Sequence, residues 1–195
     1  MVIGILALQG AFIEHKKVLD SLNVDSIKIR QPKDLDNIDG IILPGGESTV
    51  QGLLLKKFHL FEPLKEKIKN GLPVFATCAG IILLASEIEG ESSYLATLPI
   101  SVKRNAYGRQ LGSFIAKKNF QDQHNFPLIF IRAPYITKIH DDVNVLLDNN
   151  DSPVAVLYHN QLAMTFHPEL SNNNYFHKYF IEKLVQNKSH LYANM

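Results

Sequence analysis

The first half of the chain alternates short apolar runs with segments of helical period, and this order restricts the folds that it can form. The apolar runs predict strands at residues 2–8, 26–30, 40–43 and 74–76. Helical segments lie at residues 11–22 and 61–69, and a further helix begins at residues 81–86. Strands that alternate with helices form a mostly parallel sheet with helices on both faces. The sequence therefore predicts an α/β fold, a doubly wound sheet with its binding site at the carboxyl edge of the strands.

The second half of the chain has a different pattern, with many short strands. After about Gly90, strands are predicted at residues 99–103, 113–117, 128–131, 143–147, 154–158 and 162–166. The last three are joined by polar segments typical of hairpin turns, residues 149–152 and 159–161. Residues 175–185 predict a closing helix. Because no repeat, low-complexity tract or linker is found, we expect a single domain over residues 1–195, with antiparallel strands added to the parallel sheet.

The overall composition excludes several classes of protein. A chain of 195 residues with 46% hydrophobic content can bury a sizeable core. The 20 basic and 19 acidic residues give a net charge of +1, so nothing in the charge indicates binding to nucleic acid or to an anionic membrane. A single cysteine excludes an internal disulfide. There is no secretory signal pattern and no apolar run near the ~18 residues of a spanning helix, so we expect a cytoplasmic protein.

Cys78 lies between an apolar strand-like run and a helix-like run in residues 73–84. This order is typical of a nucleophile elbow, a sharp turn that lifts a side chain above the sheet edge and points the first free N–H groups of the helix at the substrate. The small neighbours Ala79 and Gly80 suit the tight backbone of such a turn. The alternative is a buried structural thiol, because free cysteine is among the most buried residue types. The local sequence favours the nucleophile.

A base for this thiol is predicted in residues 164–170, where an apolar strand ends at His167 and Glu169 follows two positions later. An imidazole takes the proton from a thiol and returns it to a leaving amine, and a carboxylate holds the ring in one tautomer. Side chains two positions apart on an extended strand point to the same face, so Glu169 is expected to reach His167. Alternatives are a strand end with a solvated turn, or a metal site built from His167 and Glu169 with His159 as a further ligand. No HExxH spacing or further ligand cluster supports a metal, and we predict none.

Backbone N–H groups for an oxyanion are predicted in residues 40–49, where an apolar strand runs into Pro44, Gly45 and Gly46. Two glycines after a strand let N–H groups face a ligand at close range, and such groups stabilise the oxyanion of acyl transfer. Together with the N–H of Ala79 they predict an oxyanion site. The alternative is an ordinary turn between a strand and a helix. The segment lacks the GxxxxGK[ST] and GxGxxG patterns of phosphate-binding loops.

Taken together, these segments resemble the class I glutamine amidotransferases, whose flavodoxin-like α/β domains carry a Cys-His-Glu triad. Within that class the chain is similar to the glutaminase subunits of pyridoxal 5′-phosphate synthase complexes, and the resemblance covers nearly the whole chain. It rests on residues 3–10, 43–49, 77–80, 104–110, 130–134 and 166–170. The Gly-Gly-Glu-Ser, Arg-Asn-x-x-Gly-Arg-Gln and Ile-Arg-Ala-Pro motifs are the most specific to this subfamily.

The resemblance implies roles for individual residues. The catalytic triad is matched by Cys78, His167 and Glu169. The positions that hold glutamine are matched by Gly46, Glu47, Ser48, Arg104, Ile131 and Arg132. Either of these arginines suits the α-carboxylate of glutamine, and Glu47 suits its α-ammonium group.

The resemblance also implies an activity and a partner. We expect hydrolysis of L-glutamine to glutamate and ammonia through a cysteine thioester. The ammonia would pass to a barrel-shaped synthase subunit, which combines it with a pentose phosphate and a triose phosphate to make pyridoxal 5′-phosphate. No metal or organic cofactor is implied for this chain. Two alternatives remain: a cysteine hydrolase or stress-response chaperone on a similar sheet, and a catalytically silent regulatory or scaffold subunit.

Overall fold

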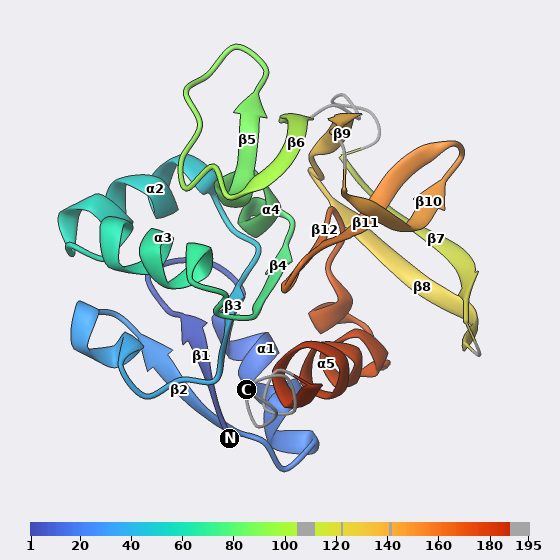
Figure 1. Cartoon of the computed structure of the whole chain (residues 1–195). Helices are drawn as coiled ribbons and strands as arrows, with labels where there is room; N and C mark the ends of the chain where they lie inside the picture. The colour runs from blue at the N-terminus through green and yellow to red at the C-terminus, as the bar shows by residue number, and fades with distance from the viewer. Residues whose placement is uncertain (105–111, 122, 141, 188–195) are drawn as a thin grey trace.

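A seven-stranded sheet forms the centre of the computed structural model, in the order β10-β11-β12-β4-β3-β1-β2 (Figure 1). The model describes residues 1–104, 112–121, 123–140 and 142–187. The strands of this sheet are β1 (Val2–Leu6), β2 (Asp25–Ile29), β3 (Gly40–Leu43), β4 (Val74–Thr77), β10 (Asn144–Asn149), β11 (Ser152–Tyr158) and β12 (Gln161–Met164). The five strands from β12 to β2 pair in parallel, and β11 and β10 extend the sheet as antiparallel strands. The predicted fold class is confirmed.

Helices cover both faces of the sheet. They are α1 (Phe12–Ser21), α2 (Ser48–Lys57), α3 (Phe61–Lys69), α4 (Ala79–Leu84) and α5 (Tyr175–Tyr179), which continues as a π-helix over Phe180–Gln186. Two 3₁₀ turns, η1 (Pro32–Leu35) and η2 (Pro168–Leu170), lie in connecting segments. Successive strand residues point to opposite faces, so Ile41 packs in the core that includes α2 and α3, whereas Ile42 packs in the core that includes α1 and α5.

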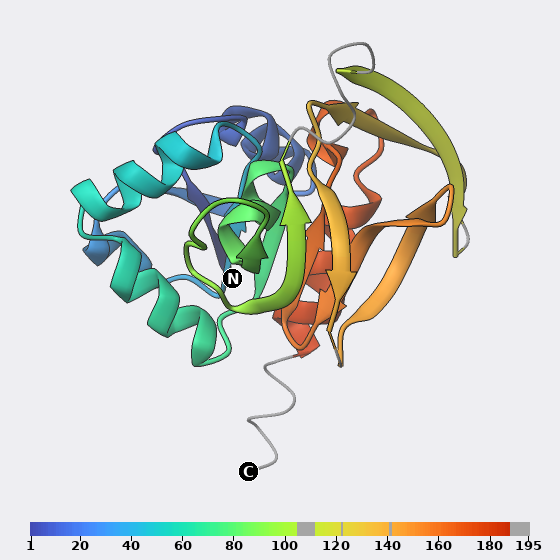
Figure 2. The ribbon, with the colours of Figure 1, turned by 90° about the horizontal axis from the view of Figure 1, so that it is seen from above.

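Two smaller sheets flank the central one. β5 (Ala85–Ile88), β6 (Leu98–Lys103) and β9 (Tyr135–Ile139) form a three-stranded sheet, and β7 (Ser113–Phe120) pairs with β8 (Gln123–Ile131) as an antiparallel ribbon. Figure 2 shows this ribbon on the side of the molecule away from α2 and α3. Within the described part of the chain, no helix is long and apolar enough to cross a membrane.

The structure differs from the sequence predictions at several element boundaries and in one strand. The helix expected to continue to residue 86 ends at Leu84, because residues from Ala85 onward pair in parallel with β6. The strand expected over residues 162–166 ends at Met164. β9 was not predicted, since only Ile136 of its five residues is buried and the strand shows no clear alternation of apolar and polar positions.

Four strands place the functional candidates at one edge of the sheet. β1, β3, β4 and β12 run in parallel, so their carboxyl ends meet at that edge. The segments that follow them begin at Ala7, Pro44, Cys78 and Thr165. The edge predicted to hold the site therefore receives a loop from each of these four strands.

Gly80 marks the closest contact between α4 and the sheet. A β-carbon at this position would collide with the backbone carbonyl oxygen of Leu43 in β3, and backbone cannot give way as a flexible side chain can. We predict that Gly80→Ala lowers the free energy of unfolding by about 1–3 kcal/mol, measured by urea denaturation. The control is Gly90→Asn, because Gly90 has a positive φ that asparagine tolerates and open space around its α-carbon. Equal urea midpoints for the two variants would contradict this account of the α4 contact.

Candidate active site

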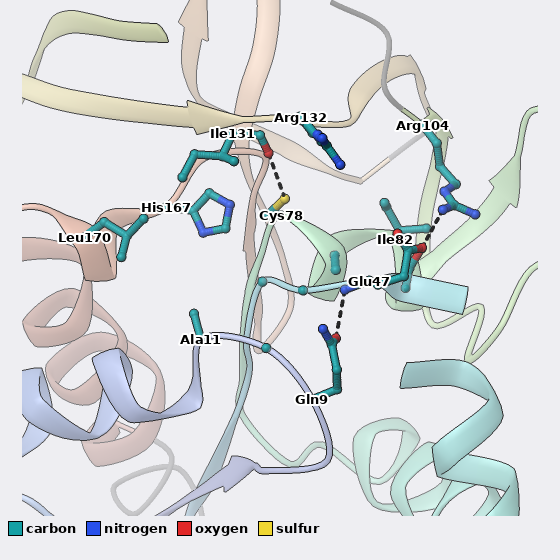
Figure 3. Close-up of a pocket in the computed structure, with 15 residues that line it drawn as sticks. Gln9, Ala11, Glu47, Cys78, Ile82, Arg104, Ile131, Arg132, His167 and Leu170 are labelled. Carbon is teal, nitrogen blue, oxygen red and sulfur yellow. Dashed lines mark hydrogen bonds and ion pairs between the residues drawn. The ribbon is translucent and has the colours of Figure 1, made fainter. Parts of the chain in front are cut away.

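A pocket with a volume of about 420 Å³ opens at the carboxyl edge of the sheet (Figure 3). Of the site residues predicted from the sequence, all except Glu169 line it: Gly45, Gly46, Glu47, Ser48, Cys78, Ala79, Arg104, Ile131, Arg132 and His167. Residues to which the sequence motifs assign no role complete the lining: Gln9, Gly10, Ala11, Ile82 and Leu170. Glu169 is buried behind His167, outside the pocket.

Cys78 occupies the sharp turn between β4 and α4. Its φ of 47° and ψ of −103° lie outside the conformations that residues with a β-carbon prefer, so the turn is strained. Its N–H donates to the carbonyl of Met164 in β12 at 2.9 Å, which ties the strained turn to the neighbouring strand. The sulfur lies 3.8 Å from the carbonyl oxygen of Ile131. Because Ala79 is the first residue of α4, its N–H has no acceptor within the helix.

His167 and Glu169 are joined by a short hydrogen bond. Nδ1 of His167 lies 2.7 Å from Oε1 of Glu169, and both side chains are almost completely buried. The expectation that an extended strand brings these two residues together is wrong, since β12 ends at Met164 and Pro168–Leu170 forms a 3₁₀ turn. Pro168 at the first position of that turn fixes φ where the chain leaves the strand. The contact therefore arises from a tight turn rather than from strand geometry.

The electrostatics of the site favour a charged imidazole. Burial by itself lowers the pKa of His167, but hydrogen bonds with Cys78 and Glu169, and the charges of both groups, raise it to about 10. Burial by itself raises the pKa of Glu169, but the neighbouring His15 and the hydrogen bond and charge of His167 lower it below its usual value. Glu169 is therefore a carboxylate at neutral pH, and it supports positive charge on His167 beside the Cys78 sulfur.

The two glycines of the β3 loop have different environments. The N–H of Gly45 donates to Oγ1 of Thr77 at 3.0 Å, and its carbonyl accepts from the N–H of Ala11 at 2.9 Å. The N–H of Gly46 has no acceptor among the described residues, and Gly46 itself is exposed. A β-carbon on Gly45 would collide with the ring of His167, so glycine is required for that close approach.

The two arginines of the pocket are also in different environments. Arg104 forms ion pairs with Glu47 at 2.6 Å and with Glu91 at 3.0 Å, and it donates to Oγ1 of Thr49. Arg132 has no carboxylate within ion-pair distance among the described residues, and Figure 3 shows its side chain over the pocket, between Cys78 and Arg104. The rest of the predicted Arg-Asn-x-x-Gly-Arg-Gln motif, residues 105–110, lies outside the described residues.

Gln9 is the main contributor to the pocket that reasoning from motifs left without a role. Its Oε1 accepts from the backbone N–H of Glu47 at 2.8 Å (Figure 3). Its carbonyl oxygen accepts from Nε2 of Gln51 at 3.0 Å. The first bond joins the loop after β1 to the loop after β3, and the second joins it to α2. The sequence did contain a signal that Gln9 lies at the pocket, because Gln9 follows a buried strand of the same parallel sheet.

His159 lies apart from His167 and Glu169, the other two residues of the metal site considered as an alternative. His159 precedes β12, whereas His167 follows it, so the two residues lie at opposite edges of the sheet. Among the described residues, no group of three or more His, Cys, Asp or Glu side chains could hold a metal ion.

The sequence profile of the SNO glutamine amidotransferase family matches residues 5–186. The chain belongs to this family. A protein from Desulfitobacterium hafniense strain DSM 10664 / DCB-2, named pyridoxal 5′-phosphate synthase subunit PdxT, is 52% identical over 191 residues, which cover 97% of this chain and 96% of that protein. The protein of the same name from Haemophilus influenzae strain PittEE is 48% identical over 187 residues, which cover 93% of this chain and 97% of that protein.

Solved structures agree with this family membership. A crystal structure described as a glutamine amidotransferase superimposes with a TM-score of 0.89 and 39% identity, covering 93% of this chain and 98% of that one. A crystal structure described as a glutamine amidotransferase from Thermotoga maritima has a TM-score of 0.60 at 16% identity, covering 95% of this chain and 88% of that one. At this low identity the second likeness shows the fold alone.

The charged form of His167 should contribute to stability in a defined pH range. The pKa of His167 is about 10 in the folded chain and 6.5 in the unfolded chain. The contribution of the charged ring to the free energy of unfolding is therefore complete below about pH 6.5 and is lost as the pH rises through about 10. We predict that the difference in unfolding free energy between the wild-type chain and His167→Asn shrinks from pH 6.5 to pH 10, where Glu169 stays ionised. Urea denaturation at several pH values measures it. A difference that is constant over this range would contradict the assigned charge state.

Proposed function

We propose that this SNO-family chain hydrolyses L-glutamine to glutamate and ammonia, with Cys78 as nucleophile, His167 as general base and acid, and Glu169 as the group that orients His167. The observation that carries the proposal is the position of His167, which is hydrogen-bonded to Glu169 and adjacent to Cys78 at a strained turn facing a pocket. A nucleophile, a base and an orienting carboxylate in this order are the components of triad catalysis.

The reaction follows from these roles. The Cys78 thiolate attacks the side-chain carboxamide carbon of glutamine, and the carbonyl oxygen becomes an oxyanion. His167 gives its proton to the departing nitrogen, the C–N bond breaks, and ammonia leaves a γ-glutamyl thioester on the sulfur. His167 then takes a proton from water, the hydroxide adds to the thioester, and the C–S bond breaks to release glutamate. Each proton that His167 accepts is returned in the following step.

Backbone N–H groups are the proposed donors to the oxyanion. The N–H of Ala79 lies at the start of α4, directly after the nucleophile. The N–H of Gly46 is free of other acceptors among the described residues, whereas that of Gly45 is engaged by Thr77. One such donor typically lowers the barrier by roughly 3 kcal/mol. We therefore propose Gly46 and Ala79 as the donors, with Gly45 available only after its bond to Thr77 breaks.

The charges of glutamine are proposed to be matched on the open side of the pocket. Arg132 is the better candidate for the α-carboxylate, because Arg104 is already paired with Glu47 and Glu91. Glu47 is half exposed at the pocket, and its Oε2 has no partner among the described residues and can face the α-ammonium group. Arg104 would then hold Glu47 in place. Gly46, Ser48 and Ile131 complete the proposed glutamine site by shape and backbone contacts.

A partner subunit is proposed to use the ammonia. The relatives from D. hafniense and H. influenzae are named as subunits of pyridoxal 5′-phosphate synthase. We propose that this chain supplies ammonia to a barrel-shaped synthase subunit for the same product, and that it does so as a single glutaminase domain in the cytoplasm, without a metal or organic cofactor of its own. The family profile, which covers residues 5–186, supports the single domain.

The role of the thiol gives the first test of function. Cys78→Ala should lower the kcat for ammonia release from glutamine by at least roughly a thousandfold while leaving the urea midpoint near the wild-type value, because it removes the nucleophile. His167→Asn should be nearly as damaging, and the double variant little worse than Cys78→Ala, because the residues act as a unit. Substantial ammonia release by Cys78→Ala would contradict the mechanism and favour a different chemistry at this sheet edge.

Coupling to the synthase subunit gives the second test. We expect a low kcat for the chain alone and a clear rise when the synthase subunit is added, since docking can reorient a glycine peptide at low steric cost. Gly46→Ala should reduce this rise more than it weakens complex formation. Its β-carbon would meet the side chains of Gln9 and Gln51, which can move, and would lie 3.1 Å from the α-carbon of Gly10, so the variant can fold with a small shift of this loop while the turn loses freedom. Complex formation is verified by size-exclusion chromatography. Equal kcat values with and without the synthase subunit would then refute activation by docking.

A further inference from the structure

The second oxygen of Glu169 is held in an unusual way. Oε1 accepts the hydrogen bond from His167, whereas Oε2 is fully buried and has no hydrogen-bond partner among the described residues. A buried carboxylate oxygen without compensation is costly, and the cost favours protonation of the group. Nε2 of His15 faces Oε2 at 3.6 Å, and both side chains are completely buried. The backbone N–H of Glu169 also acts on its own carboxylate and lowers its pKa.

His15 lies on α1 and does not line the pocket. Its Nδ1 is 2.9 Å from Nε2 of His177, and its Nε2 is 3.2 Å from Oγ1 of Thr77. Three elements besides its own helix thus place polar groups against this one ring: the turn after β12 with Glu169 and His167, α5 with His177, and β4 with Thr77. Glu14 is the charged group on its own helix that acts on it.

The hydrogen bonds of the two histidines select one tautomer. A single proton lies between Nδ1 of His15 and Nε2 of His177, so one ring donates and the other accepts. If His15 donated, its bare Nε2 would turn a lone pair toward the Glu169 carboxylate, and the buried Nδ1–H of His177, which has no partner among the described residues, would be an unsatisfied donor. If His177 donates, the N–H of His15 sits on Nε2, facing Oε2 of Glu169 and Oγ1 of Thr77. The second arrangement removes the lone pair that faces the carboxylate, and at Nδ1 of His177 it leaves an acceptor rather than a donor without a partner among the described residues.

We propose that His15 is a positioning residue for the glutaminase reaction. A neutral His15, held by His177 as the Nε2–H tautomer, directs its N–H dipole at Oε2 of Glu169 and keeps that carboxylate ionised and oriented for His167. His177 acts one step further away by fixing the proton on the correct nitrogen of His15. This inference extends the proposed triad and rests on the proposed function.

The charge state of His15 suits this role. Burial lowers the pKa of His15 below its usual value, and the opposing effect of Glu169 does not overcome it. Burial also lowers the pKa of His177. A neutral ring stabilises the carboxylate through its dipole without placing a second full positive charge near His167. The Glu169 carboxylate can then support the imidazolium of His167 during both proton transfers.

The test uses two substitutions that differ in reach. The side-chain amide of glutamine extends about as far as Nε2 of histidine, whereas that of asparagine extends only as far as Nδ1. His15→Gln therefore keeps a donor facing Glu169, and His15→Asn does not. The matched control is Leu19→Ala, one turn further along α1 and equally buried, which weakens the packing of the same helix without touching Glu169.

Three measurements are made on the full-length chain. The first is kcat and KM for glutamine in the presence of the synthase subunit. The second is the rate of Cys78 alkylation by iodoacetamide as a function of pH, which needs no glutamine and reports only this site because the chain has one cysteine. The third is the tautomer of His15 in the wild-type chain, read from ¹⁵N-labelled histidine by NMR.

The proposal predicts that His15→Asn lowers kcat by roughly 10- to 100-fold, because the buried Glu169 carboxylate loses the N–H dipole that faces it, with KM little changed. It also predicts that the acid limb of the alkylation profile moves up by about one pH unit, because Glu169 loses the group that keeps it ionised. His15→Gln should recover most of both losses. Leu19→Ala should lower the urea midpoint but leave the alkylation profile at the wild-type position. NMR should show His15 neutral and protonated on Nε2.

Several outcomes would overturn the proposal. They are a wild-type alkylation profile for His15→Asn, equal profiles for the asparagine and glutamine variants, the same shift in Leu19→Ala, or a His15 ring protonated on Nδ1. If His15→Asn does not fold, the wild-type tautomer and the profile of His15→Gln still decide the question. If the wild-type chain released no ammonia from glutamine, the proposed function would be refuted instead. The alkylation profiles would still test the effect of His15 on the reactivity of Cys78.

Discussion

The parallel pairing of β12 with β4 is the interaction on which the candidate site depends. It aligns Met164 with Thr77, and the Cys78 N–H then bonds to the carbonyl of Met164. Because both strands end at the same edge, the segments that leave them carry His167 and Cys78 into one pocket. A shift of this pairing by one residue would turn every side chain of the strand to the other face and separate the two groups. The site is thus a consequence of register in a buried sheet.

The buried carboxylate of Glu169, behind the pocket, explains why several polar side chains are packed around it. A carboxylate removed from water is expensive unless it is paired and hydrogen-bonded. Glu169 is stabilised on one oxygen by His167 and faces His15 on the other. Thr77 links His15 to the N–H of Gly45, so the base and the glycine loop are connected through the same small network. Packing of α1 and α5 on this face of the sheet therefore also determines the electrostatics of the nucleophile.

Close backbone approach is the second requirement of the pocket. The loop after β1 and the loop after β3 touch through the bond from Ala11 to Gly45 and through Gln9 to Glu47. Gly10 has a φ of 105°, and a β-carbon there would collide with the carbonyl of Gly45. Such loops hold their shape by backbone hydrogen bonds rather than by apolar packing. This leaves the exposed Gly46 peptide with fewer constraints than its buried neighbour.

Local patterns are enough to predict the fold class, the edge of the sheet that carries the pocket, and the residue types placed there, because strand and helix periods and the turns at Cys78 and Gly45 can be read from neighbouring residues. Long-range packing, in contrast, is needed to show that Glu169 approaches His167 from a 3₁₀ turn and that Arg104 is paired with Glu47. His15 gave no local signal, since a histidine on the buried face of a helix has the same pattern whether it meets a hydrophobic core or a carboxylate. Its partners come from α5, β4 and the turn after β12, and only the packing of these distant segments brings them together.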